Sequence, residues 1–291
     1  MTTDLDRTAA DFALARPRLF GIAYRMLSSV QEAEDLVQDV WLKWQTYDRD
    51  TVREPAAFLA TMITRLAINA SQTARARRET YIGPWLPEPV DTSADPTLGA
   101  ERGEALELAM LVLLEKLSPA QRAAYILREA FDYPYDQIAE IVQLSEANVR
   151  QLVSRSRKRL AGERREQVST DEQRKLLATF MAAAQEGDLA ALVELLAADA
   201  VSYSDGGGIV RATKLILLGA DKIAKVIAAY KDSFWTGSEL TFAETNGGWS
   251  AVVSRAGEVF AVISISASAD GIDQVQWMLN PEKLANLSFS S

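Results

Sequence analysis

The residues best suited to chemistry with another molecule lie between Ser145 and Arg165. Arginine side chains pair with the O6 and N7 atoms of guanine, and Asn or Gln side chains pair with N6 and N7 of adenine. This stretch carries 7 Lys+Arg against 2 Asp+Glu, a local balance of +5. The side chains expected to face outward are Glu146, Ala147, Asn148, Arg150, Gln151, Ser154 and Arg155, and Arg157, Lys158 and Arg159 follow where phosphates would be met. The spacing predicts a surface that reads nucleic acid.

Two short helices joined by a tight turn, within Tyr135–Lys158, must position these side chains. The first helix has an inner face of Ile138, Ala139, Ile141 and Val142, and the second has Val149, Leu152 and Val153. Ser145 suits the N-cap of the second helix. Such a pair lays its second helix in the major groove of DNA. The alternative is a solvated basic helix within a bundle.

Composition limits the other kinds of chemistry. The chain has 291 residues, enough for two or three domains, and a net charge of −9. Residues 166–291 carry much of that acidity, with 9 Lys+Arg against 16 Asp+Glu. The sequence has no cysteine and no histidine, which excludes disulfides, thiolate metal sites and every Ser-His or Cys-His catalytic arrangement. We expect no metal and no cofactor. With neither a leader pattern nor a membrane-length apolar stretch, a cytoplasmic location is expected.

Helical spacing covers the N-terminal part, from Asp11 to Arg78. In Val30–Trp44 the predicted buried stripe is Ala33, Val37, Val40, Trp41 and Trp44, and an acidic face with Asp35, Gln38 and Asp39 lies off that stripe. A second helix is predicted from Pro55, with Phe58, Leu59, Met62, Leu66 and Ala70 buried and Arg75, Arg77 and Arg78 at its end. The acidic face is ordinarily just a solvated helix surface.

The stretch from Tyr81 to Gly99 holds four of the nine prolines, so it is predicted to be a linker. It nevertheless contains Trp85 and Leu86, and a passive tether has little reason to expose a tryptophan. We expect this linker to dock on another part of the chain. The alternative is a linker that merely covers its neighbour's core. Helices are predicted to resume over Glu101–Leu117 and, after a Ser118 cap, over Ala120–Phe131.

The C-terminal part changes from helices to strands. Helices are predicted over Asp171–Glu186, Leu189–Ala197 and Ala220–Ser233, and strands over Ala200–Ser204, Ser238–Thr245, Trp249–Ser254, Val259–Ser266 and Gln274–Leu279. This order predicts an α+β domain whose curved sheet wraps around helices.

With these elements in place, residues 1–165 resemble an extracytoplasmic-function (ECF) sigma factor of bacterial RNA polymerase. The run Glu32–Trp44 resembles the helix that binds the polymerase clamp. The block Pro55–Arg78 resembles the segment that melts and captures the minus-ten promoter element, and Tyr135–Leu160 resembles the helix-turn-helix for the minus-thirty-five element. The resemblance implies polymerase contacts at Asp35, Gln38 and Asp39. It implies capture of unpaired bases by Thr61, Arg65, Asn69, Gln72 and Arg75.

Three further motifs resemble one subgroup of these sigma factors, which carries a fused SnoaL-like C-terminal domain in place of dependence on a separate anti-sigma partner. The motifs are Trp85, Leu86, Pro87, Glu88 and Pro89 in the linker, Asp205, Gly206, Gly207 and Gly208 downstream, and Asn280, Pro281 and Lys283 near the end. The resemblance implies that they regulate the sigma part by contacts between domains. The chain departs from the subgroup pattern at Ile209, where Lys is usual, and at Gln143, where the turn usually has Gly. A non-glycine there is predicted to need a positive φ.

The expected organisation is therefore multidomain: two all-α helical sigma domains, the second with the helix-turn-helix, followed by an α+β SnoaL-like domain. The predicted boundaries are 1–80, a linker over 81–100, 101–165 and 166–291. RNA polymerase core and promoter DNA are the expected partners, with an unknown small molecule as a further ligand of the C-terminal domain.

Rival interpretations remain. The Asp205–Gly208 run also suits a simple strand-to-strand loop, and a SnoaL-like cavity lined by Tyr203, Asp205, Trp235 and Trp277 would suit an isomerase, cyclase or hydrolase. Because a lone aspartate would have to act as general base there, we expect no catalysis. A repressor that uses only the helix pair is the third interpretation.

Overall fold

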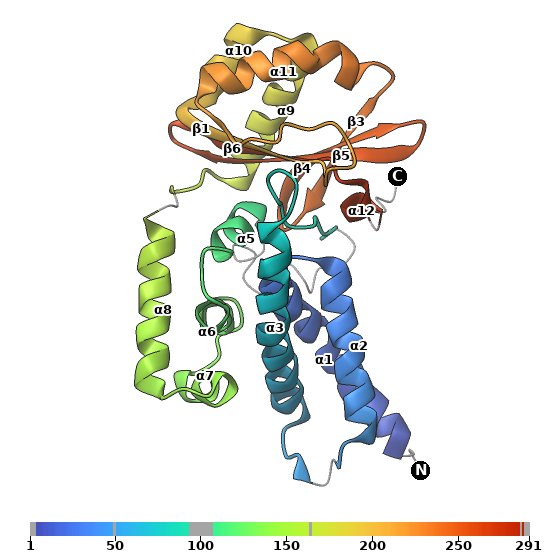
Figure 1. Cartoon of the computed structure of the whole chain (residues 1–291), viewed down its shortest axis with the longest axis vertical. Helices are drawn as coiled ribbons and strands as arrows, with labels where there is room; N and C mark the ends of the chain where they lie inside the picture. Colours follow the sequence, from blue (N-terminus) through green and yellow to red (C-terminus); the bar gives the residue numbers. More distant parts are fainter. Residues whose placement is uncertain (1–3, 49–50, 93–106, 163–164, 286, 288–291) are drawn as a thin grey trace. The chain divides into compact units, whose positions relative to one another are not determined.

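A computed structural model gives the structure of residues 4–48, 51–92, 107–162, 165–285 and 287, and the structural statements below concern these residues. The chain forms two compact units (Figure 1). The first comprises Met1–Glu79, Asp95–Leu106 and Met110–Glu163, and the second Thr80–Ala94, Glu107–Ala109 and Arg164–Ser291. The beginning of the predicted linker therefore belongs to the second unit. Its remainder, residues 93–100, and the start of the helix predicted from Glu101 lie outside the described residues.

Three long helices open the first unit: α1 (Asp4–Leu27), α2 (Val30–Thr46) and α3 (Pro55–Glu79). Helix α2 begins at an N-cap, Ser29, whose side chain accepts a hydrogen bond from the Glu32 amide. The predicted stripe of α2 is confirmed at its four buried positions, while Trp41 is half-buried against Phe12, with ring centroids 4.9 Å apart.

The predicted stripe of α3 is wrong at four of its five positions. Only Leu59 of the predicted set is buried; Phe58, Met62, Leu66 and Ala70 are half-buried. The other residues that α3 buries are mostly small: Ala60, Ile63, Thr64, Ala67, Ser71 and Ala74. Helix α3 packs against α1 and α2 and also against α6 and α7, so it has neighbours on more than one side and no single apolar stripe.

Helix α5 (Leu108–Leu114) begins with two residues assigned to the second unit, and the rest of α5 belongs to the first unit. The first unit also contains α6 (Pro119–Glu129), α7 (Tyr135–Val142) and α8 (Glu146–Ala161). A capping box formed by Ser118 and Gln121 starts α6 at the expected place. The turn between α7 and α8 contains Gln143 in the left-handed region, with φ 58° and ψ 45°, which confirms the predicted positive φ. Its amide donates to the Ala139 carbonyl and so closes α7.

The second unit is an α+β domain, as predicted. It contains α9 (Thr170–Glu186), α10 (Leu189–Leu195), α11 (Ala220–Trp235) and the short α12 (Pro281–Leu284). Its strands are β1 (Leu196–Asp205), β2 (Leu217–Leu218), β3 (Glu239–Thr245), β4 (Gly248–Arg255), β5 (Glu258–Ser268) and β6 (Gly271–Met278). They form one sheet in the order β2-β1-β6-β5-β4-β3, in which only β1 and β6 run parallel. The helix predicted to reach Ala197 ends at Leu195, because Leu196 already begins β1.

Helices α9, α10 and α11 cover one face of this sheet (Figure 1). The core between helices and sheet contains Ala200 of β1, Ile263 of β5 and Val275 of β6. Because side chains alternate along a strand, Ser202 and Ser204 share the helix side with Ala200, whereas Asp205 projects from the opposite face. This alternation therefore separates the helix-covered face of the sheet from the surroundings of Asp205. Over the described ranges, no helix has both the length and the apolar character that crossing a membrane requires.

Candidate nucleic-acid interface and linker clamp

The basic surface predicted on α8 is exposed as expected. Every predicted DNA-binding residue of this helix lies on the solvent side: Glu146, Asn148, Arg150, Gln151, Ser154, Arg155 and Lys158. The buried residues of α8 lie on its other side, at Val149, Val153, Ser156 and Leu160. Ser145 caps the helix by accepting a hydrogen bond from the Asn148 amide, as predicted. The exposed N-terminal half of α8 is thus free to approach a base edge.

Two of the arginines on α8 have partners within the first unit. The Arg150 guanidinium donates to one Glu146 oxygen, at 2.6 and 3.0 Å, and lies 4.4 Å from the centre of the Tyr135 ring. These contacts hold Arg150 in one orientation on the helix surface. Arg157, expected to meet phosphate, instead donates to Glu129 of α6 at 2.6 and 3.1 Å, and this hydrogen bond raises the pKa of Arg157 above its ordinary value.

The second predicted nucleic-acid surface lies along α3. Arg65, Asn69, Gln72 and Arg75 are exposed there, and Thr61 is half-buried with its hydroxyl donating to a backbone carbonyl of its own helix. Arg65 donates to two carbonyls of α7, those of Glu140 at 2.8 Å and Ile141 at 3.1 Å. The last carbonyls of a helix have no partner within the helix, so Arg65 caps α7.

The acidic face of α2 is also present as a continuous exposed surface. Asp35, Gln38 and Asp39 are exposed, one turn apart, and opposite the buried stripe of the helix. Their role toward polymerase stays a prediction.

A partly buried ionic cluster that the sequence did not reveal joins the helices of the first unit. Glu115 pairs with both Arg78 at the end of α3 and Arg122 of α6. Arg122 also donates to the Arg25 carbonyl at 2.8 Å and to the Ser28 hydroxyl at 2.7 Å. Burial opposes ionisation of Glu115, but the two guanidinium groups outweigh it and hold the pKa of that carboxyl below its ordinary value. The cluster therefore ties the end of α3 to α6. No sequence period marks it.

In the second unit, the linker motif, the glycine motif and the C-terminal motif converge on Asp205. Its side chain is fully buried, and both carboxylate oxygens accept two hydrogen bonds each. One oxygen accepts from the Tyr81 hydroxyl at 2.6 Å and the Gly207 amide at 3.0 Å. The other accepts from the Leu86 amide at 2.9 Å and from Lys283 at 2.7 Å. We call this arrangement the linker clamp.

Lys283 and Asn280 complete the clamp from the C-terminal side. The Lys283 ammonium also donates to the Leu86 carbonyl at 2.5 Å and lies 4.2 Å from the centre of the Trp85 ring, a cation–π distance. Asn280 donates to the Tyr81 hydroxyl at 2.9 Å and caps α12 by accepting from the Glu282 amide. Leu86, Pro87, Glu88 and Pro89 are buried, whereas Trp85 is half-buried. Tyr81 also belongs to the clamp, although it lies outside the three predicted motifs.

The glycines are needed because other atoms lie where side chains would be. A Cβ added at Gly207 would lie 2.6 Å from the Asn280 side chain, and one at Gly208 would lie 2.9 Å from Ile82. Both glycines also have positive φ, 64° and 73°. The glycine motif therefore admits the linker and the C-terminal motif at close range.

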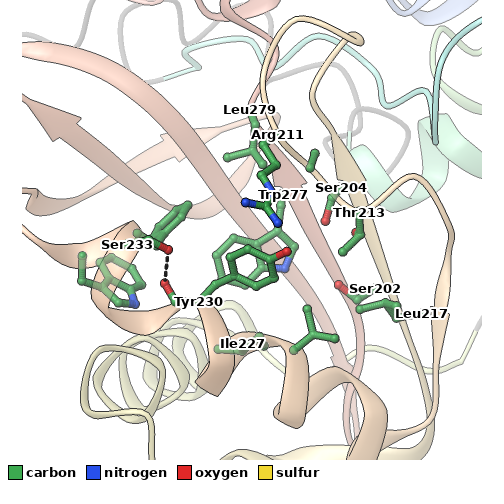
Figure 2. Close-up of a pocket in the computed structure, with 14 residues that line it drawn as sticks. Ser202, Ser204, Arg211, Thr213, Leu217, Ile227, Tyr230, Ser233, Trp277 and Leu279 are labelled. Carbon is green, nitrogen blue, oxygen red and sulfur yellow. Dashed lines mark hydrogen bonds between the residues drawn. The ribbon is translucent and has the colours of Figure 1, made fainter.

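A cavity lies on the other side of the sheet, between α11 and strands β1 and β6 (Figure 2). Trp235 and Trp277 line it, as predicted. Tyr203 and Asp205 do not, because the strand alternation turns them to the opposite face. No cluster of metal-ligating side chains occurs within the part of the chain that the structure describes.

Two family models match the chain. Residues 12–78 match sigma-70 region 2, and residues 107–160 match sigma-70, region 4. The first match covers α2 and α3, and the second covers the helix pair α7 and α8 with α5 and α6 before it. Both surfaces expected to bind nucleic acid thus fall within sigma-type regions.

Whole-chain comparisons extend the similarity to the C-terminal unit. The chain is 36% identical over 224 residues to the ECF RNA polymerase sigma factor SigJ of Mycobacterium tuberculosis, covering 75% of this chain and 71% of that protein. It is 26% identical over 285 residues to a probable ECF RNA polymerase sigma factor, SigI, of the same organism, covering 96% and 95% of the two chains. The crystal structure of SigJ matches with a TM-score of 0.76 at 30% identity, over 95% of this chain and 98% of that one.

Proposed function

Because the chain belongs to the ECF family of RNA polymerase sigma factors, we propose that its SnoaL-like C-terminal unit regulates it by holding the linker between its two DNA-binding regions. As a sigma factor it binds RNA polymerase core and promoter DNA and directs the initiation of transcription. The observation that carries the regulatory proposal is the buried Asp205, which receives hydrogen bonds from Tyr81 and Leu86 of the linker.

The two DNA-binding surfaces take different parts of the promoter. Region 2 captures unpaired bases of the minus-ten element along α3, with Arg65, Asn69, Gln72 and Arg75 as its polar exposed side chains. Region 4 reads the duplex minus-thirty-five element with α8. The acidic face of α2 binds polymerase, where complementary charge fixes the orientation of docking.

The distance between the two promoter elements requires regions 2 and 4 to separate. The minus-ten and minus-thirty-five elements lie roughly 25 base pairs apart, which is about 85 Å of B-DNA. A compact body of some 165 residues has a radius of gyration of only about 15 Å. The packed first unit, in which Arg65 caps α7 and Glu115 joins α3 to α6, is therefore a closed form of the sigma part.

The clamp restrains this separation by shortening the chain that is free to extend. Residues 80–92, if extended, span about 3.3–3.6 Å each, or roughly 45 Å in all. While the Leu86 amide is bound to Asp205 and the Thr92 amide to the Glu244 carbonyl, this length is unavailable. Release of the linker would therefore favour the open form that promoter binding needs.

The C-terminal unit regulates and does not catalyse. Among the described residues, the lining of its cavity contains no carboxylate that could act as general base, and Asp205 is occupied on the other face of the sheet. The enzyme alternative is not favoured. We place the protein in the cytoplasm, where its polymerase partner works.

Run-off transcription with RNA polymerase core tests the regulatory role. Trp85→Ala and Lys283→Met each remove part of the clamp and are expected to raise transcript yield at limiting sigma concentration. Arg174→Met is the matched control, because Arg174 also lies over a tryptophan ring of the second unit, 4.0 Å from the centre of the Trp249 ring, and neither residue is part of the clamp. If both clamp variants match the control in transcript yield and in hydrogen exchange of the linker, the proposal is refuted.

A further inference from the structure

The cavity of the C-terminal unit has the size and shape of a small-molecule site. Its volume is about 320 Å³, within the range of roughly 300–1,000 Å³ for ligand pockets. Aromatic rings from α11 and β6 form one end. Phe234 packs edge-on against Trp277, with ring centroids 5.5 Å apart at 89°, and against Trp235 at 4.8 Å and 76°. This arrangement provides an apolar aromatic wall whose edge-to-face ring contacts hold it in place.

The other end of the cavity is polar, and its polar groups converge (Figure 2). Ser202 and Ser204 reach it from β1, and Arg211 and Thr213 from the loop that follows the glycine motif. The Thr213 hydroxyl is buried and has no hydrogen-bond partner among the described residues. A buried polar atom without a partner is costly, so this hydroxyl points to a missing ligand atom.

The charge of the lining selects an anion. Of the described residues that line the cavity, Arg211 alone is charged, and none is Asp or Glu. Among the described residues Arg211 has no carboxylate partner. Its guanidinium lies over the Tyr230 ring, with the guanidinium carbon 5.8 Å from the ring centre. Arginine binds a carboxylate with two parallel hydrogen bonds, which fixes the orientation of the bound group.

We propose that the cavity binds an aromatic or alicyclic carboxylic acid, with its ring system against Trp277 and Phe234 and its carboxylate on Arg211. The Thr213 hydroxyl donates to the same carboxylate. The described residues of the lining include no carboxylate that could act as general base, and the acid is therefore a bound ligand and not a substrate.

The same site is connected to the linker clamp through adjacent residues, and this second step rests on the proposed function. Leu279, which lines the cavity, donates its amide to the Asp205 carbonyl at 2.8 Å. Ala212, also in the lining, lies against the glycine motif, 2.9 Å from where a Cβ of Gly206 would be. A ligand that orders these segments therefore stabilises the clamp, and the linker stays bound.

Calorimetric titration of the full chain with naphthylacetate, and with its neutral analogue naphthylacetamide, tests the site. The acid is expected to bind at least tenfold more tightly than the amide. Arg211→Gln is expected to abolish that preference and Thr213→Val to weaken acid binding severalfold, whereas Arg174→Met leaves both affinities unchanged. Absence of saturable binding by the acid, or equal affinities of acid and amide for the unmodified protein, would overturn the inference.

Hydrogen exchange at the Leu86 and Val90 amides tests the connection. Saturating naphthylacetate is expected to slow exchange of both amides severalfold in the unmodified protein and to have no effect in Arg211→Gln. Binding without any change in exchange refutes the connection but leaves the ligand site in place. Failure to bind, in a protein whose clamp variants still alter transcription, refutes the site and leaves the proposed regulation intact.

Discussion

Replacing Asp205 by asparagine isolates the charge of the linker clamp with little change in shape. The carboxylate accepts four hydrogen bonds, two at each oxygen. An asparagine offers one acceptor oxygen and one NH₂ donor. If the NH₂ group takes the position of Oδ2, it faces the Leu86 amide and the Lys283 ammonium, which are both donors. The reverse orientation places it against the Gly207 amide and leaves Tyr81 without its acceptor.

The expected size of the effect follows from burial. Asp205 is 0% exposed and its Lys283 partner has a side chain only 13% exposed, so this is a buried ion pair. Breaking a buried pair by removing one partner costs about 3–5 kcal/mol, because the other charge is left uncompensated. At about 1.4 kcal/mol per factor of ten, the equilibrium between bound and released linker shifts by roughly 10²- to 10⁴-fold.

Native-state hydrogen exchange measures this shift at single amides. The Leu86 amide donates to Asp205 and the Val90 amide donates to the Asn246 side chain, so both report on linker release. In Asp205→Asn both amides are expected to lose protection by the factor given above. The control is Asp199→Asn, which removes a partner of Arg165 at a carboxylate with 71% exposure, where a surface ion pair contributes little. Protection of Leu86 and Val90 equal to that of the unmodified protein would refute the argument that Asp205 holds the linker.

Three further predictions concern the other surfaces. Arg150→Ala is expected to relax base preference at one position by about 1–3 kcal/mol. Lys158→Ala is expected to weaken binding to every sequence and to lower the slope of log binding constant against log salt concentration by about one. Equal effects of the two changes on matched and scrambled duplexes, at several salt concentrations, would contradict this. Glu115→Gln is expected to destabilise the first unit at neutral pH in thermal unfolding. Because the folded-state pKa of Glu115 is below its ordinary value, this contribution is present above about pH 4.3 and is lost as the pH falls further, so the two proteins should converge in acid. Burial, followed by the hydrogen bond to its carboxylate partner, raises the pKa of Tyr81. Its contribution to the clamp therefore persists up to about pH 10 and is lost above it; a tyrosinate titration of the unmodified protein minus that of Tyr81→Phe should show one group that ionises above the ordinary range.

Local pattern predicted the elements of this protein better than their contacts. The stripe of α2 and the left-handed turn at Gln143 followed from spacing and turn chemistry alone. The stripe of α3 did not, since periodicity indicates one buried face and α3 packs against helices on more than one side. Strand β2 has two residues, too few for any alternation to be recognised. The cluster of Arg78, Glu115 and Arg122 depends on three segments meeting, which no spacing along the sequence encodes.

For the candidate site, the sequence indicated which residues take part better than it indicated which face of the sheet their side chains project from. The three motifs of the clamp were predicted to be regulatory from a family resemblance, and the structure brings them together at Asp205, while their regulatory role stays a prediction. The cavity prediction was right for Trp235 and Trp277 and wrong for Tyr203 and Asp205, although all four belong to the correct domain. The strand predicted from Ala200 was enough to place Asp205 correctly. Ala200 is a core position, and a residue an odd number of positions along the same strand, such as Asp205, projects from the opposite face of the sheet.

That alternation makes the cavity and the clamp neighbours on opposite faces of one strand. Ser204 lines the cavity and Asp205, the next residue, holds the linker. Coupling between two sites is a free energy shared by both, so each must affect the other by the same factor. If naphthylacetate makes linker release less favourable by a given factor, then release of the linker must weaken naphthylacetate binding by that factor. Asp205→Asn shifts the linker toward release and is therefore expected to weaken naphthylacetate binding by up to that factor. Calorimetry on this variant, whose substitution lies outside the cavity lining, measures it directly. Unchanged affinity, together with slowed linker exchange in the unmodified protein, would violate this reciprocity and exclude the clamp as the element that both sites share.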